Sequence, residues 1–263
     1  MQMTLGFLGC GQMGGALLEG WLGQGLVTAD AVRIADPATG PAWSARLGVA
    51  SVGTQAMLDD ADVVLLAVKP QVLAEVVAPL RFRPDQLVVS VVAGLSLSRV
   101  QGLCSPARVV RVMPNVACQV RAGATLLLTA GAAAEDVRQV AALFEAVGHV
   151  ERLADERLFH AGTSVSGSGP AWIFMAMEAL ADGAVAAGLP RAAALRLAAH
   201  TVAGAGALAV AERAHPGELK DRVTSPGGTT IQGLRALEAG GYRAALIEAV
   251  LAATERSMAL EAL

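Results

Sequence analysis

Residues 6–14 read Gly-Phe-Leu-Gly-Cys-Gly-Gln-Met-Gly, and this stretch decides the fold of the first half of the chain. It follows an apolar run at residues 4–8 that predicts a buried strand, and it leads into a helical pattern. A Gly-x-Gly-x-x-Gly spacing is often only a tight loop, but between a strand and a helix it favours dinucleotide binding. Gly9 would permit the turn, Gly11 would let a pyrophosphate approach, and Gly14 would let the helix pack closely.

Strand-like and helix-like segments alternate over the rest of the first half. We expect strands at residues 4–8, 32–35, 63–68, 87–92 and 109–113, and helices at residues 13–22, 42–47, 54–61, 72–80 and 97–103. Runs at residues 124–129 and 149–153, around a helix at 134–147, should extend the sheet. Such alternation predicts a doubly wound parallel sheet. The expected class is α/β, with a Rossmann-type dinucleotide-binding domain over residues 1–154.

From about residue 155 the strand pattern stops and helical patterns take over. Helices are expected at residues 170–187, 191–213, 231–239 and 242–260, with glycine and proline between them. The segment at residues 195–210 is apolar nearly all round and rich in alanine and glycine, which predicts a buried helix in close contact with others, including those of a second subunit. Residues 155–263 are therefore expected to form an all-helical domain.

Composition limits the possible partners. Hydrophobic residues make up 54% of the chain and the mean hydropathy is +0.52, yet no segment approaches the ~20 uninterrupted apolar residues of a membrane span. An extensive subunit interface explains the apolar surplus better than a membrane. A net charge of −3 argues against nucleic acid. Three cysteines without metal-type spacing, and no signal-like start, predict free thiols, no metal site and a cytoplasmic protein.

A second informative stretch lies at residues 223–230, Val-Thr-Ser-Pro-Gly-Gly-Thr-Thr, just before the helical pattern at 231–238. Thr229 or Thr230 stands where the residue capping that helix belongs. Such a helix start would offer free backbone N–H groups and nearby hydroxyls to a small anion such as a carboxylate. A capped turn between two helices is the alternative, and the length of the run favours a site.

Six motifs in order carry a resemblance to a known family. They are GFLGCGQMG at residues 6–14, AVKPQ at 67–71, VVAG at 91–94, RVMPN at 111–115, SGSGPAW at 166–172 and HPGELKDRVTSPGGTTIQGLRALE at 215–238. Together they resemble the pyrroline-5-carboxylate reductases, which make L-proline from 1-pyrroline-5-carboxylate with NAD(P)H. The chain departs from the family at Trp172, where tyrosine is usual, and at Gln12, where asparagine is common. The resemblance implies a homodimer, with assembly into a larger ring open.

The glycine spacing and the position of Asp36, together with the resemblance, imply roles for particular residues. The cofactor would be bound by Leu8, Gly9, Gly11, Gln12, Met13, Asp36, Thr54, Ala67, Val68, Lys69, Pro70, Ala93 and Gly94. The substrate would be bound by Ser225, Gly228, Thr229, Thr230 and Glu156, with the amides of residues 228–230 on its carboxylate and the hydroxyl of Thr230, the catalytic candidate, facing the ring nitrogen. Glu156 could equally be a helix-start acid, and Asn115 could bind a ligand or form a turn.

Asp36 bears on the choice of cofactor. It lies 22 residues after Gly14, close to the ~20-residue offset of the ribose-binding acid in NAD sites. A carboxylate there would repel a 2′-phosphate, whereas the resemblance favours NADPH. Arg33 could still reach a phosphate, and Asp36 could merely cap the turn before Pro37. We expect NADH to be used well and any preference for NADPH to be weak.

Other functions stay open at this point. A β-hydroxyacid dehydrogenase shares the glycine-rich start and the helical second domain, but it needs a lysine in the first long helix of that domain, and residues 170–187 contain none. A related imine reductase is a further enzyme alternative. A non-catalytic NAD(P)H sensor would have no use for the segment at residues 223–230.

Overall fold

The computed structural model describes residues 3–261, which form two compact units. The first contains the chain up to Gly167 together with the part that starts at Ala253, and the second contains Ser168–Ala252. The expected boundary after residue 154 lies earlier than this division. One reason is that α7 (Leu158–Thr163) packs on the sheet, where Phe159 is fully buried.

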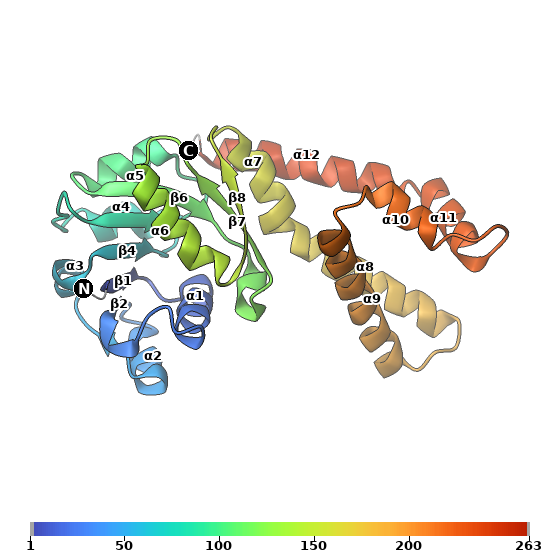
Figure 1. The fold of residues 1–263 in the computed structure, drawn as a ribbon, viewed down its shortest axis with the longest axis horizontal. Coiled ribbons are helices and arrows are strands. Elements are labelled where there is room, and N and C mark those ends of the chain that lie inside the picture. The colour runs from blue at the N-terminus through green and yellow to red at the C-terminus, as the bar shows by residue number, and fades with distance from the viewer. Residues whose placement is uncertain (1–2, 262–263) are drawn as a thin grey trace. The chain divides into compact units, whose positions relative to one another are not determined.

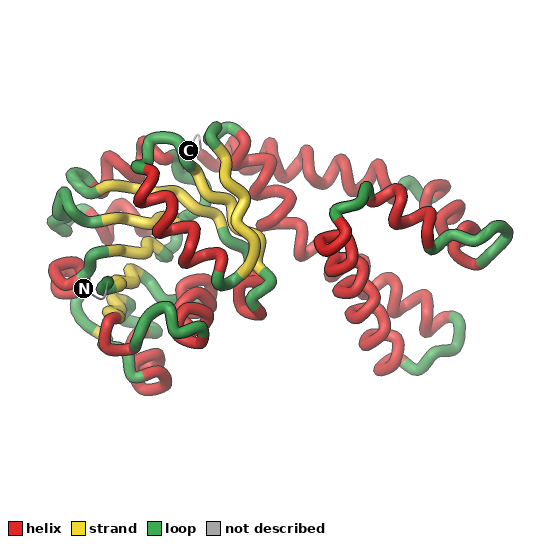
Figure 2. The backbone as a smooth tube through the Cα atoms, viewed as in Figure 1, coloured by secondary structure: helices red, strands yellow, loops and turns green. Residues whose placement is uncertain are grey.

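The described strands of the first unit form one eight-stranded sheet (Figure 2). They are β1 (Leu5–Leu8), β2 (Val32–Ala35), β3 (Ala50–Ser51), β4 (Val63–Leu66), β5 (Leu87–Ser90), β6 (Arg108–Met113), β7 (Gly123–Leu128) and β8 (Gly148–Leu153). Their order is β3-β2-β1-β4-β5-β6-β7-β8. Strand order reverses between β1 and β4, and in open α/β sheets ligands bind at such a switch point, outside the carboxyl ends of the strands.

Helices cover both faces of this sheet (Figure 1). One face carries α1 (Gln12–Gly23), α2 (Gly40–Leu47) and α6 (Ala134–Glu145), and the other carries α3 (Thr54–Asp60), α4 (Pro70–Val77), α5 (Leu97–Cys104) and α7. On the first face Trp21 packs against Phe7 and Phe144, with ring centroids 5.8 and 5.6 Å apart. Since both faces are buried there, β1 and β4 are apolar throughout, as the sequence pattern required. The α/β class with a Rossmann-type sheet is confirmed.

The sheet departs from the expected parallel arrangement at one pair of strands, so that β7 and β8 run opposite to the other six. β7 pairs with β6 in antiparallel register, with Val112 opposite Leu127. The connection between them holds only a short 3₁₀ turn, Val116–Val120, and a parallel crossover needs a dozen or more residues. β8 then returns parallel to β7, after α6. The two-residue strand β3 was not expected, because so short a strand leaves no periodic pattern.

The second unit contains α8 (Gly169–Ala186), α9 (Arg191–Glu212), α10 (Pro216–Arg222), α11 (Thr229–Ala239) and most of α12 (Tyr242–Glu261). Four of these agree with the expected helices within a few residues at each end. The His-Pro-Gly sequence at residues 215–217 was expected to be a break between helices, but α10 begins there. Pro216 occupies the first turn, and the His215 ring accepts a hydrogen bond from the Gly217 N–H at 3.1 Å.

The helices of the second unit leave many apolar side chains exposed. Small residues on α8 and α9, Ala181, Ala194 and Ala198, are buried where these helices pack together. Leu197 and Val210 of α9 are 58% and 79% exposed, so the expected burial of residues 195–210 is not provided by this chain alone. Among the described residues α9 is also long and apolar enough to span a membrane, with a hydropathy of 1.4, which the sequence pattern had not suggested.

The packing of α1 gives a first prediction. A Cβ atom on Gly15 would overlap the indole ring of Trp43, so Gly15→Ala should lower the free energy of unfolding by about 1–3 kcal/mol. Gly23→Ala, at the end of the same helix with open space around it, should be neutral or stabilising by up to about 1 kcal/mol. Urea unfolding at a fixed protein concentration measures both. Equal effects at the two glycines would contradict the steric explanation.

Candidate active site

The residues expected to bind a cofactor gather at the carboxyl edge of the first five strands. The glycine-rich loop follows β1, Asp36 follows β2, Ala67–Pro70 follows β4, and Ala93 with Gly94 follows β5. Thr54 opens α3, after β3. Backbone hydrogen bonds join these loops, since the Gly9 N–H donates to the Ala35 carbonyl at 3.1 Å and the Ala67 N–H donates to the Leu8 carbonyl at 2.9 Å.

The glycine-rich loop has the geometry that its spacing requires. Gly9 has a φ of +87°, and a Cβ there would lie 2.9 Å from the Ala67 oxygen. A Cβ on Gly14 would lie 2.9 Å from the Gly9 oxygen, so a larger residue would push α1 away from the sheet. Gly11 has no atom within 4 Å of such a position, which leaves the start of α1 open. Exposed Gln12 and half-buried Met13 form the first turn, whose free N–H groups suit a pyrophosphate.

Asp36 binds backbone groups at this edge. Its carboxylate accepts hydrogen bonds from the N–H groups of Cys10 at 2.8 Å, Ala38 at 2.9 Å and Thr39 at 3.0 Å. Burial opposes ionisation, but these hydrogen bonds outweigh it and lower the pKa of Asp36. The carboxylate therefore caps the turn that begins at Pro37 and ties it to the glycine-rich loop.

The suggestion that Arg33 reaches a phosphate is wrong. Its guanidinium pairs with Asp60 at 3.0 Å and donates to the Asp30 carbonyl at 2.7 Å. Asp30 precedes β2, so the side chain of Arg33 extends toward the amino end of the strand and away from the glycine-rich loop.

Sequence reasoning missed the indole of Trp43. Its Nε1 donates to the Cys10 carbonyl at 2.8 Å, and the Thr39 hydroxyl donates to the same oxygen at 2.9 Å. The second glycine of the Gly14-Gly15 pair was the available signal, because only a residue without a side chain leaves room for this ring. Burial, with the charge of Asp36 as a second cause, raises the pKa of the Cys10 thiol to about 12, so this thiol stays protonated.

A cavity of about 350 Å³ adjoins the loops after β4 and β5. It is lined by Pro70, Gln71, Ala93, Gly94, Leu95, Arg99 and Leu260. Lys69, the exposed residue that caps α4, directly precedes Pro70 in the sequence, and the half-buried Val68 comes before it. The cavity thus brings together residues from two of the expected cofactor segments and one residue from the end of α12.

Two further residues have partners that their sequence motifs did not reveal. Oε1 of Glu156 accepts hydrogen bonds from the Leu97 N–H at 2.6 Å and from Arg111 at 2.5 Å. It therefore binds the first residue of α5, and not the start of its own helix. The Asn115 side chain bonds only backbone, donating to the Ser166 carbonyl at 2.9 Å and accepting from Ala117 and Ala124. These bonds support the turn role for Asn115.

In the second unit, residues 225–230 come together at the start of α11. The residue that caps this helix is Gly228, so the expectation of Thr229 or Thr230 as the cap is wrong. The cause is local, because Gly228 has extended backbone torsions and a Cβ there would overlap the Ser225 hydroxyl. The Gly228 N–H donates to the Ser225 carbonyl at 3.1 Å. Thr229 and Thr230 keep helix-start N–H groups that α11 itself cannot satisfy.

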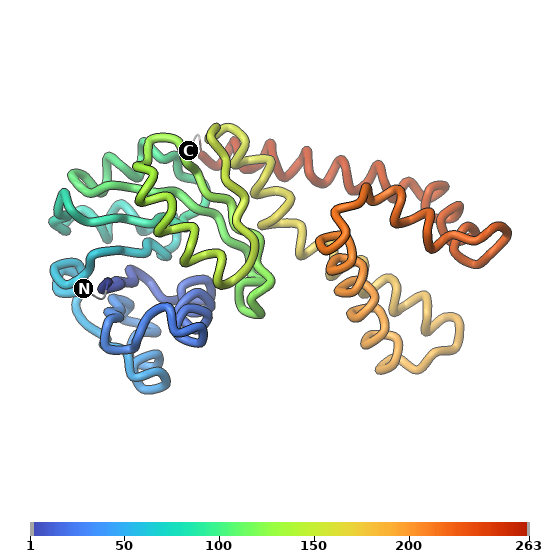
Figure 3. The backbone as a smooth tube through the Cα atoms, viewed as in Figure 1, coloured from blue at the N-terminus to red at the C-terminus, as the bar shows by residue number. Residues whose placement is uncertain are grey.

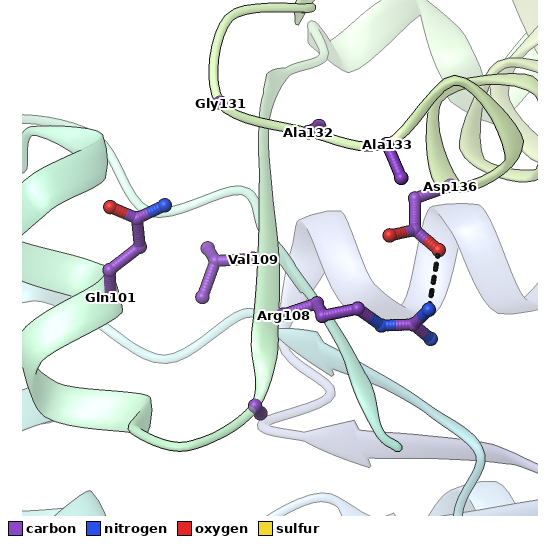
Figure 4. A pocket seen from close by; sticks show the side chains of 8 residues that line it. Gln101, Arg108, Val109, Gly131, Ala132, Ala133 and Asp136 are labelled. Carbon is purple, nitrogen blue, oxygen red and sulfur yellow. Dashed lines mark ion pairs between the residues drawn. The ribbon is translucent and has the colours of Figure 1, made fainter. Parts of the chain in front are cut away.

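A second cavity, of about 380 Å³, lies at the amino end of β6 (Figure 4). Arg108, the first residue of that strand, points toward Asp136 of α6, with 3.3 Å between the paired atoms. The glycine-rich loop lies at the carboxyl edge of the sheet, so this cavity is separate from it.

Among residues 3–261, no group of three or more His, Cys, Asp or Glu side chains is placed to hold a metal.

Comparison with known proteins gives one consistent result. Residues 156–260 match the family described as "Pyrroline-5-carboxylate reductase dimerisation", and residues 4–94 match "NADP oxidoreductase coenzyme F420-dependent". The pyrroline-5-carboxylate reductase of Pisum sativum is 43% identical, over 98% of this chain and 96% of its own. The enzyme of that name from Escherichia coli (strain K12) is 38% identical, with 98% of both chains covered.

Solved structures agree with this comparison. The pyrroline-5-carboxylate reductase of Coxiella burnetii superposes with a TM-score of 0.90 at 31% identity, over 99% of both chains. The Plasmodium falciparum pyrroline carboxylate reductase with NADP bound gives a TM-score of 0.88 at 27% identity, over 98% of both chains. A 3-hydroxyisobutyrate dehydrogenase from Mycobacterium tuberculosis gives only 0.52 at 20% identity over 68% of this chain, which shows a shared fold alone.

The hydrogen bonds of Asp36 give a prediction for stability. An asparagine cannot accept from three N–H groups as a carboxylate does, so Asp36→Asn should lower the free energy of unfolding by about 1–3 kcal/mol at pH 7. The folded-state pKa is lowered, so this stabilisation is complete above the unfolded value of about 3.9 and is lost as the pH falls through the folded value. Urea unfolding at pH 7 and at acid pH should show that the difference in unfolding free energy between wild type and Asp36→Asn becomes smaller at acid pH.

A matched control is Asp85→Asn, at a side chain that is 73% exposed beside Arg83. This variant should change the unfolding free energy by less than about 1 kcal/mol. An equally large effect at both positions, or no pH dependence for Asp36, would contradict the assigned role.

Proposed function

This chain belongs to the pyrroline-5-carboxylate reductase family, and from that membership we propose that it reduces 1-pyrroline-5-carboxylate to L-proline with NAD(P)H, the last step of proline synthesis. The observation that carries the proposal is the identity of 43% and 38% to enzymes of that name over 98% of the chain. The β-hydroxyacid dehydrogenase alternative is disfavoured, since α8 contains no lysine.

The residues of the first unit fit the cofactor. The open backbone at Gly11 and the N–H groups at the start of α1 would hold the pyrophosphate. The segment Ala67–Pro70, with Ala93 and Gly94, would border the nicotinamide, while Leu8 and Thr54 lie at the same edge. When bound, NAD(P)H supplies the hydride, and the protein supplies binding and orientation.

The residues at the start of α11 fit a substrate carboxylate. The N–H groups of Thr229 and Thr230 point out of the first turn at the positive end of the helix dipole. Ser225 shapes the preceding turn through its contact with Gly228. The hydroxyl of Thr230 would face the ring nitrogen of the substrate. A protonated cyclic imine is already electrophilic, so orientation can replace a strong general acid.

Asp36 supports efficient use of NADH. Its carboxylate would place a negative charge near a 2′-phosphate, and Arg33 extends toward the opposite end of its strand. The Ala38 and Thr39 N–H groups, which could hold a phosphate, already donate to Asp36. Any preference for NADPH should therefore be weak, even though the Plasmodium falciparum relative binds NADP.

The experiment that tests the proposed function is a direct assay. Absorbance of NADH, and separately of NADPH, is followed on addition of 1-pyrroline-5-carboxylate to the purified protein. Loss of absorbance with formation of proline supports the proposal. Cofactor binding without turnover would favour the alternative of a non-catalytic sensor. A preference for NADPH of about a hundredfold or more in kcat/KM would show that Asp36 does not read the ribose.

The organisation of the chain fits an oligomeric enzyme. Residues 1–154 would bind the cofactor, and residues 155–263, which nearly coincide with the matched dimerisation region, would form a homodimer and the substrate site. The exposed apolar side chains of α8, α9 and α12 would pack against the second subunit, which accounts for the apolar α9 without a membrane. Assembly into a larger ring and a cytoplasmic location belong to the same proposal.

Thr230 gives a kinetic prediction. Thr230→Val removes the hydroxyl and keeps the backbone amide, so kcat should fall about ten- to a hundredfold, the value of one hydrogen bond to a charged group. Cofactor affinity and thermal stability should hardly change. Thr224→Val is a control in the same segment, because the Thr224 hydroxyl donates to the Lys220 carbonyl at 2.7 Å. Its kcat should stay within about threefold of wild type. Unchanged kinetics of a folded Thr230→Val protein would remove Thr230 from the mechanism.

The exposed face of α9 gives a prediction for assembly. Ala203 is exposed in the single chain, so an arginine there would be harmless to a monomer. In a dimer it would bury an unpaired charge, and Ala203→Arg should therefore abolish both assembly and activity. Ala142→Arg, on the exposed side of α6, serves as the control. Light scattering of wild type that shows an active monomer at micromolar concentration would refute the dimer.

A further inference from the structure

Arg111 is a buried cation next to the proposed nicotinamide end of the site. It lies on β6, in register with Ser90 of β5, and its side chain is 6% exposed. Its guanidinium stacks over the Phe159 ring at 4.9 Å and lies 2.5 Å from Oε1 of Glu156. A charge so deeply buried persists only where it is paired, so Arg111 fixes the groups around it.

The first of these groups is the loop between β5 and α5. The oxygen of Glu156 that meets Arg111 also accepts the Leu97 N–H at 2.6 Å. Leu97 is the first residue of α5, and the loop before it carries Ala93 and Gly94. One carboxylate oxygen thus connects the buried arginine to the loop that would border the nicotinamide.

The second group is the last turn of α12, which returns to the first unit at the red end of the chain (Figure 3). Oε2 of Glu261 lies 3.5 Å from Arg111 and 3.6 Å from Nε2 of His160. The other ring nitrogen of His160 lies 3.0 Å from the Ser257 hydroxyl. The neighbouring Leu260 lines the cavity of about 350 Å³ together with Ala93 and Gly94.

We propose that Arg111 and Glu156 are positioning residues for the nicotinamide end of the cofactor. Through Glu156, Arg111 holds the β5–α5 loop, and through Glu261 it holds the last turn of α12, so the pair sets the shape of the cavity between them. Glu156 then acts on the cofactor side, and not as the direct substrate contact that its motif had suggested. The inference rests on the proposed dinucleotide site.

The test is calorimetric titration of the whole protein with NADH, alongside steady-state kinetics. Glu156→Gln keeps the shape of the side chain and removes its charge, so the Kd for NADH should rise about tenfold while the KM for 1-pyrroline-5-carboxylate stays within about twofold. Glu156→Asp, which keeps the charge, should recover part of the affinity. Hydrogen exchange of residues 91–97 in the NADH-free protein should become faster in Glu156→Gln.

Arg111→Met alone would leave two carboxylates without their cation, so the informative variant is Arg111→Met with Glu156→Gln. If the two residues act as one unit, the loss of NADH affinity in the double variant should be smaller than the sum of the losses in Arg111→Met and in Glu156→Gln. Arg108→Met is the matched control, because Arg108 lies on the same strand with its own partner Asp136 at the opposite edge. Its Kd for NADH should stay within about twofold of wild type.

Two outcomes would overturn the inference. One is an unchanged Kd for NADH in Glu156→Gln with a raised KM for 1-pyrroline-5-carboxylate, which would make Glu156 a substrate contact. The other is an additive further loss of NADH affinity in the double variant. Failure of the proposed function would look different, because wild type would bind NADH and not oxidise it, and the Kd series would still decide the role of Arg111.

Discussion

The close approach of α1 to the sheet is the constraint on which the rest of the first unit depends. Gly9 and Gly14 meet so closely that a single added carbon would lie 2.9 Å from a backbone oxygen. This approach lets Trp21 reach Phe7 and Phe144 in the core below. It also leaves the first N–H groups of α1 open at the carboxyl edge, where a pyrophosphate can bind. Packing of the core and binding at the edge therefore have the same cause.

The carboxylates near the site hold loops in place. Asp36 receives three backbone N–H groups, and Glu156 receives one together with a buried arginine. Spacing along the chain found Asp36 and the family resemblance suggested Glu156, but neither could identify the partners of these acids. Backbone N–H groups freed by a turn or a helix start compete with any ligand for a nearby carboxylate. The positions of the two acids were predictable, but for this reason their hydrogen-bond partners were not.

Periodicity predicted most elements because their cause is local. Strands buried on both faces are continuous apolar runs, and amphipathic helices repeat every three or four residues, so bounds such as Leu5–Leu8 and Ala134–Glu145 could be estimated closely. Features that depend on contacts between distant parts of the chain were not predicted. The reversed direction of β7 depends on the length of one connection, and the return of the end of α12 to the first unit depends on contacts with Arg111 and His160.

The cap of α11 shows the limit of residue preference. Threonine and glycine are about equally favoured at such a position, and Gly228 takes it, because Ser225 leaves no room for a side chain there. The consequence is useful for binding. Threonines placed one and two residues inside the helix have hydroxyls that are not needed to cap it, so these hydroxyls and the free N–H groups remain available together. If a threonine capped the helix, its hydroxyl would instead accept a hydrogen bond from a backbone N–H of the first turn.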